Sequence, residues 1–111
     1  MADHLNAEMR ACIQACHDCQ TICLAEAIGH CLEVGGRHTE PKHFNLMLDC
    51  AEICRTAAGF MARGSDHHPH ICRECAEICR ACAASCDALD GMEECAETCR
   101  RCAENCERMA A

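Results

Sequence analysis

The chain has 111 residues, which we assign to a single domain over 1–111, and its formal net charge of −8 argues against binding to nucleic acid or to an anionic membrane surface. Half of its residues are hydrophobic, yet it has sixteen cysteines, two phenylalanines and no tryptophan or tyrosine. A core made mainly of cysteine and alanine buries little large apolar side-chain surface. We therefore expect another component to complete this core.

The first ten residues have neither a basic start nor an apolar run, so they do not look like a secretory signal peptide. No stretch of the sequence approaches the length of a transmembrane helix. These two observations predict a cytoplasmic protein without a membrane partner, in a compartment where thiols stay reduced.

Four segments carry cysteine and apolar residues in steps of three and four, the spacing of one α-helix face. They cover about 2–34, 40–63, 67–89 and 92–109, and glycines follow the first segment, as is common at a helix end. No segment alternates with period two, so no strand is expected. Four helices joined by short connections predict an all-α protein, an antiparallel up-down-up-down four-helix bundle with a cysteine-lined core.

Three of the four helices carry the same cysteine frame, whose steps of four, three and four residues place four thiols on one helix face. The frames begin at Cys12, Cys75 and Cys95, whereas the second helix contributes only Cys50 and Cys54. The complete set is Cys12, Cys16, Cys19, Cys23, Cys31, Cys50, Cys54, Cys72, Cys75, Cys79, Cys82, Cys86, Cys95, Cys99, Cys102 and Cys106.

Three uses of so many cysteines fit the pattern poorly. Cysteine as a small hydrophobe accounts for one or two such residues, not for a fixed frame. Disulfides within a helix are opposed by geometry, because Cβ atoms three or four residues apart are separated by roughly 5–6 Å, whereas a disulfide needs roughly 3.5–4.5 Å. Iron–sulfur clusters are usually held by loops that wrap the cluster, and a uniform helical face offers no such loop.

Two metal-binding uses remain open. Facing pairs of cysteines could hold zinc or cadmium in a few closed tetrahedral sites. Alternatively, thiolates select the soft ion Cu(I), which accepts two or three ligands. A continuous tube of thiols would then accept a row of bridged ions, which makes the uniform frame an advantage. This interpretation predicts several Cu(I) ions per chain as the bound species.

The methionines favour Cu(I), because thioether is a ligand for copper and is little used by zinc. Every methionine after the first is in phase with a cysteine face, namely Met9, Met47, Met61, Met92 and Met109. In an up-down-up-down bundle, the first and third turns share one end, which collects His30, His38, His43, Met47 and Met92. The opposite end collects His4, Met9, Met61, His67, His68, His70 and Met109.

Individual positions refine this picture. His30 is in phase with Cys23, whereas Cys31 is rotated away from that face, and Gly29 is a point at which the helix can bend. His17 lies one position off the cysteine face and is expected on the surface. We find no catalytic constellation, since the two serines have no basic partner in the pattern, and the sequence therefore predicts a protein that is not an enzyme.

The segment Cys50-Ala-Glu-Ile-Cys54, its repeat at 75–79 and the cysteine frames on successive helices resemble the bacterial four-helix-bundle copper storage proteins over nearly the whole chain. The missing signal peptide makes the chain look like the cytosolic branch of that family. The resemblance implies a homotetramer that stores many Cu(I) ions on inward-facing cysteines, captured first by histidine and methionine at the end with the first and third turns.

The resemblance implies that the other cysteines bind metal together with four residues at the capturing end, His30, Cys31, Met47 and Met92. One departure concerns His43, a position where the family pattern can have another cysteine. His43 is therefore added to the expected ligands, and the part of the tube beside the second helix is expected to hold fewer or weaker sites.

Overall fold

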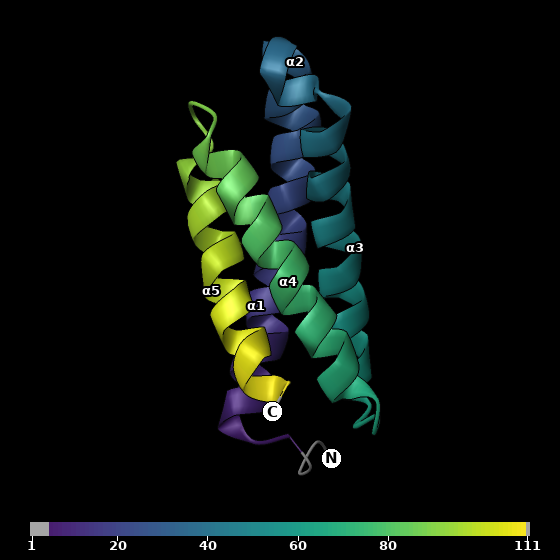
Figure 1. The fold of residues 1–111 in the computed structure, drawn as a ribbon. Coiled ribbons are helices and arrows are strands. Elements are labelled where there is room, and N and C mark those ends of the chain that lie inside the picture. Colours follow the sequence, from purple (N-terminus) through teal and green to yellow (C-terminus); the bar gives the residue numbers. More distant parts are fainter. Residues whose placement is uncertain (1–4, 111) are drawn as a thin grey trace.

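The computed structural model describes residues 5–110, which form helices and connecting turns without any strand (Figure 1). The elements are α1 (Ala7–Glu26), a π-helical turn (Ala27–Cys31), α2 (Leu32–Val34), a 3-10 turn (Gly36–Thr39), α3 (Pro41–Ala62), α4 (His68–Asp87) and α5 (Glu93–Met109). The four predicted helices are confirmed. The expected start of the first helix at residues 2–4 lies outside the described residues, and within them this helix begins at Ala7.

Local sequence signals explain where the helices begin. The side chain of Asn6 caps α1 by accepting a hydrogen bond of 2.8 Å from the backbone N–H of Met9. Pro41 and Pro69 lie in the first turns of α3 and α4, where a missing backbone N–H leaves no helical hydrogen bond unmade. Between α4 and α5, Gly91 has a φ of 80°, a conformation that favours glycine.

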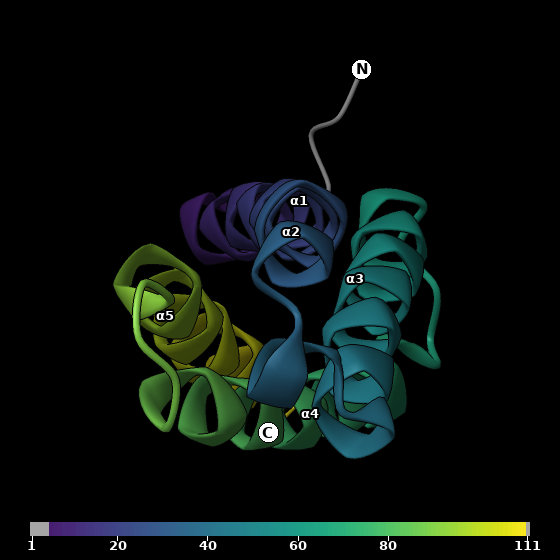
Figure 2. The ribbon, with the colours of Figure 1, turned by 90° about the horizontal axis from the view of Figure 1, so that it is seen from above.

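The long helices surround one central axis in the order α1, α3, α4, α5, and each contacts the helix before and after it in this ring. Figure 2 shows this arrangement from above, and Figure 1 shows that neighbouring long helices run in opposite directions. The bundle measures 46 × 23 × 18 Å. The predicted antiparallel up-down-up-down bundle is thereby confirmed. Among the described residues, no helix combines the length and the apolar character needed to cross a membrane.

The connections after α1 and after α4 meet at one end of the bundle, which we call the α2 end. The guanidinium of Arg37 donates a hydrogen bond of 3.3 Å to the backbone carbonyl of Ala88. His38 Nε2 lies 3.1 Å from the backbone carbonyl of Asp90. These two contacts tie both turns together, as the bundle topology predicted.

The core consists almost entirely of cysteine and alanine. All sixteen cysteines are fully buried, and Met47, Met61 and Met92 are the largest side chains buried with them. Buried alanines such as Ala83 on α4 and Ala103 on α5 lie along the groove between their helices, where their small side chains let the backbones approach. The helices therefore pack closely through alanine while the cysteines occupy the space around the axis.

Replacing Ala83 with leucine should lower the free energy of unfolding by about 1–3 kcal/mol, because Ala83 is only 3% exposed and a larger side chain there would push α4 and α5 apart. The neighbouring Ala84 is exposed, so Ala84→Leu should change stability by about 0.5 kcal/mol or less. Urea denaturation of the reduced, metal-free variants, followed by far-ultraviolet circular dichroism, measures both values. Equal losses in the two variants would contradict close packing at Ala83.

Candidate metal-binding site

The thiols form a continuous column along the bundle axis, in which each step joins cysteines of two different helices. In order along the column, neighbouring sulfur atoms lie 3.6–3.9 Å apart through Cys12, Cys106, Cys16, Cys102, Cys54, Cys79, Cys50, Cys19, Cys99, Cys23 and Cys95. All sixteen cysteines are free thiols, so no disulfide interrupts the column. The structure thus brings the predicted cysteine faces of all four long helices together.

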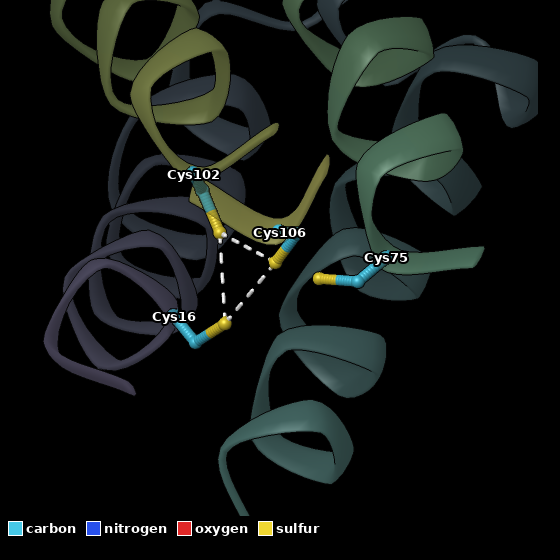
Figure 3. A group of neighbouring side chains, drawn as sticks. All are labelled: Cys16, Cys75, Cys102 and Cys106. Atoms are coloured by element: carbon cyan, nitrogen blue, oxygen red, sulfur yellow. Dashed lines mark hydrogen bonds between the residues drawn. The ribbon is translucent and has the colours of Figure 1, made fainter. Parts of the chain in front are cut away.

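Within the column, groups of four thiols come close enough to share one metal ion. Four such groups have all their sulfur atoms within 4.8 Å of one another: Cys16/Cys75/Cys102/Cys106, Cys54/Cys75/Cys79/Cys102, Cys19/Cys50/Cys54/Cys79 and Cys19/Cys23/Cys50/Cys99. Figure 3 shows the first group, whose side chains point toward one another from α1, α4 and α5. Neighbouring groups share members, so ions that fill adjacent groups must be bridged by common thiolates.

Met47 closes the column toward the α2 end. Its thioether sulfur lies 3.5 Å from Cys86, 3.7 Å from Cys82 and 3.9 Å from Cys95. The predicted alignment of this methionine with the thiols is confirmed by these contacts. One thioether and three thiols from α3, α4 and α5 therefore form a mixed sulfur environment.

Beyond Met47, three different donor types meet around Cys31. The Nε2 atom of His43 lies 3.7 Å from Cys31 Sγ, and the sulfur of Met92 lies 4.0 Å from the same thiol. On the other side of the ring, His43 Nδ1 lies 2.7 Å from the hydroxyl of Ser85. The prediction that Ser85 has no basic partner was therefore wrong. The two residues come from different helices, and only their packing brings them together.

Cys31 reaches the core because the chain makes a π-helical turn over Ala27–Cys31. In a regular α-helix, residues eight apart such as Cys23 and Cys31 differ in direction by about 80°. Here the N–H of Leu32 bonds to the carbonyl of Ala27, and the wider turn leaves Ala27 and Cys31 fully buried and His30 half-buried. The prediction that Cys31 is rotated away was therefore wrong.

His30 has an unused donor or acceptor atom at the α2 end. Its Nε2 is buried and, among the described residues, is the one buried side-chain nitrogen or oxygen without a hydrogen-bond partner. The His30 ring meets the His38 ring edge-on, with centroids 5.3 Å apart. A Cβ atom at Gly91 would lie 3.2 Å from His30 Nε2, so glycine leaves the space that this ring occupies. A buried, unpartnered imidazole nitrogen is suited to ligating a metal.

The remaining histidines and methionines mostly lie outside the column. His17 is exposed, as predicted, and so are His67 and His70 at the opposite end. His68 donates from Nδ1 to the backbone carbonyl of Ser65 at 2.9 Å. Met61 is fully buried at that end. Met9 and Met109 are half-buried against the core, whereas His4 lies outside the described residues.

Burial and mutual contacts set the protonation of the donors. Burial raises the pKa of the Cys31 thiol and lowers the pKa of the His43 imidazole. In contacting thiol pairs, one partner keeps its proton and donates it to the other. A hydrogen bond from Cys106 lowers the pKa of Cys102 to about 7, and the same contact raises the pKa of Cys106. A metal cation entering the column therefore displaces protons.

The family model described as copper storage protein matches residues 3–111. A crystal structure of a protein from Nitrosospira multiformis is 56% identical to this chain, with a TM-score of 0.91 over 93% of this chain and 94% of that one. The Cu(I)-bound copper storage protein BsCsp3 is 38% identical, with a TM-score of 0.85 over 94% and 99% of the two chains. The apo form of copper storage protein 3 from Bacillus subtilis is 38% identical, with a TM-score of 0.81 over 92% and 98%.

Deleting Ile28, an exposed residue of the π-helical turn, should convert the turn into a regular α-helix. Cys31 would then follow Cys23 by seven residues and stay on the buried face, so its thiol should remain protected. Mass spectrometry after labelling of the native, reduced protein with a thiol reagent measures this protection at the level of single peptides. Rapid labelling of Cys31 in the deletion variant, with the other thiols protected, would contradict the expectation that a seven-residue spacing in a regular helix keeps Cys31 on the buried face.

Proposed function

Because the chain belongs to the copper storage protein family, we propose that it stores and buffers several Cu(I) ions as thiolate complexes inside the bundle. The observation that carries this proposal is the continuous column of thiols, whose neighbours lie 3.6–3.9 Å apart. Thiolates are soft ligands that favour Cu(I), and two or three of them satisfy this ion. A column without gaps provides such ligand sets at every level along the axis.

Charge balance favours Cu(I) over divalent ions in this core. All sixteen thiols are fully buried, and an unpaired charge in such a core is costly. When one Cu(I) replaces one thiol proton, the buried charge does not change. A Zn²⁺ ion held by four thiolates of its own leaves two negative charges in the core. Filling the whole column therefore costs least with a monovalent cation that bridges between thiolates.

The α2 end provides the ligands that we assign to copper capture. The His43 Nε2 atom and the Met92 thioether lie 3.7 Å and 4.0 Å from the Cys31 thiol. Among the described residues, His30 Nε2 is also buried there without a partner. Mixed, weaker donors outside the thiol column can take an ion and pass it inward. Met47, which contacts three thiols, links this outer group to the column.

We assign the protein to the cytosol and to a homotetrameric assembly, and we regard it as a store without enzymatic activity. Free thiols are maintained in the reducing cytosol, which supports the location. Leu24, Ile28 and Leu32 form an exposed apolar stripe, 40–57% accessible, along one side of α1 and α2, and it supports association with further copies. The net charge of −8 supports the expectation that nucleic acid is not a partner.

A zinc or cadmium buffer is the alternative that one observation favours. Each of the four thiol groups has its sulfur atoms within 4.8 Å of one another, which suits a tetrahedral thiolate site. Because neighbouring groups share cysteines, only a few separate sites of this kind can be filled at once. The alternative thus predicts saturation at a small number of ions.

Titrating the reduced protein with Cu(I) under anaerobic conditions, in competition with a Cu(I) chelator, should show tight uptake of a number of ions close to the sixteen cysteines. Thiolate-to-copper absorption should grow through the titration, and the midpoint of thermal unfolding should rise, since ions bound by the folded state stabilise it. Saturation at two to four ions would contradict the storage proposal and favour discrete tetrahedral sites.

Met47→Leu keeps the volume of the side chain but removes the thioether from Cys82, Cys86 and Cys95. We expect affinity for the Cu(I) bound beside these thiols to fall about tenfold, a loss typical when one supporting ligand is removed. Met61→Leu, the same change at the opposite end, should leave that affinity unchanged and serves as the control. If Met47→Leu leaves copper affinity intact, the thioether is not a ligand, as the zinc alternative requires.

A further inference from the structure

His43 on α3 connects two different environments at the α2 end. Its Nε2 faces the buried thiol of Cys31 at 3.7 Å. Its Nδ1 lies 2.7 Å from the hydroxyl of Ser85, a half-buried residue of α4. His43 and Ser85 also line one groove of about 460 Å³ between α3 and α4, together with Leu46 and Ala84. The imidazole is therefore fixed between the core on one side and a surface groove on the other.

The positions of the protons follow from the contacts around the ring. The Cys31 thiol has one proton, and the acceptors near it are His43 Nε2 at 3.7 Å and the Met92 thioether at 4.0 Å. An imidazole nitrogen is a better acceptor than a thioether, which is only a weak one. A neutral imidazole that accepts at Nε2 has its own proton on Nδ1, so this N–H donates to the oxygen of Ser85.

We propose that Ser85 is a positioning residue, whose hydroxyl accepts the Nδ1 proton of His43 and holds the ring with the Nε2 lone pair toward Cys31, so that the two side chains form one nitrogen–sulfur site for Cu(I). The inference rests on the proposed storage function, because it assigns the ligand geometry at the capturing end. Ser85 does not touch the ion in this arrangement. It acts by selecting one tautomer and one orientation of the ligand that does.

Without the hydroxyl, the contact that still favours a proton on Nδ1 is the S–H of Cys31, which is a weak donor 3.7 Å from Nε2. Water in the groove can then approach Nδ1 from several directions, whereas the serine hydroxyl is held at one position on α4. The ring then populates both tautomers, and the form with its proton on Nε2 has no lone pair to offer a metal. Loss of an outer partner of this kind typically costs 10–100-fold in metal affinity.

The first test uses the reduced, metal-free protein and needs no copper. Nitrogen NMR of the imidazole rings should show the wild-type His43 as the Nδ1–H tautomer, whereas Ser85→Ala should give a mixture of both tautomers. Ser85→Thr, which keeps a hydroxyl, should restore the wild-type signals. Ser65→Ala is the matched control, because Ser65 accepts its hydrogen bond from the backbone of His67 at the opposite end. The same single tautomer in wild type and Ser85→Ala would overturn the proposal.

The second test measures Cu(I) affinity by chelator competition for four proteins: wild type, Ser85→Ala, His43→Ala and the double variant. One Cu(I) ion should bind more weakly in His43→Ala, and Ser85→Ala should lower the affinity for that same ion by at least tenfold. In the double variant, where His43 is already absent, Ser85→Ala should have no further effect. A loss of equal size in both backgrounds would show that Ser85 acts independently of His43 and would overturn the proposal.

The two proposals can fail separately. A wild-type protein that saturates at two to four ions contradicts copper storage, whatever the serine does. The NMR comparison of wild type and Ser85→Ala decides the tautomer question in that case too, because it uses no metal. Far-ultraviolet circular dichroism of each variant confirms that the bundle is folded before either comparison is made.

Discussion

An isolated thiolate is costly in a buried core, so a buried thiol loses its proton most readily where a cation takes the proton's place. All sixteen cysteines lie in the interior, and the sulfur atoms of the column are spaced so that they contact thiols of other helices. In the metal-free protein, these contacts are hydrogen bonds in which one thiol donates its proton to the sulfur of another. When a cation binds, the same contacts become bridges. The packing of thiol against thiol and the scarcity of large side chains both fit this exchange of proton for metal.

The sequence predicts those parts of the structure that depend on a regular helix. The cysteine frames begin at Cys12, Cys75 and Cys95, and all of them face the axis as the steps of three and four indicate. The meeting of the first and third turns follows from the topology, and so does the location of Met47 and Met92 near one end. Such features need only the period of the helix and the direction of each segment.

Three features were beyond sequence analysis because they depend on departures from regularity or on contacts between helices. The π-helical turn moves Cys31 onto the buried face, and a calculation with a constant 3.6 residues per turn places it elsewhere. The contact of His43 with Ser85 joins residues 42 positions apart on facing helices. The isolated Nε2 of His30 appears only once its neighbours, including Gly91, are known. All three lie at the α2 end, where the cysteine frame itself is interrupted.

Because neighbouring groups of four thiols have cysteines in common, the order in which ions enter the column also affects the order in which they leave it. Cys54 belongs to two groups of four, and so do Cys19 and Cys50, so an ion can leave one group while it is already held by the next. In the proposed store, an ion can therefore pass between groups through shared thiolates without being released into the interior. If ions are loaded through the α2 end, those that arrive last lie nearest to it and leave first. The column then behaves as a stack, and its deepest copper is the slowest to turn over.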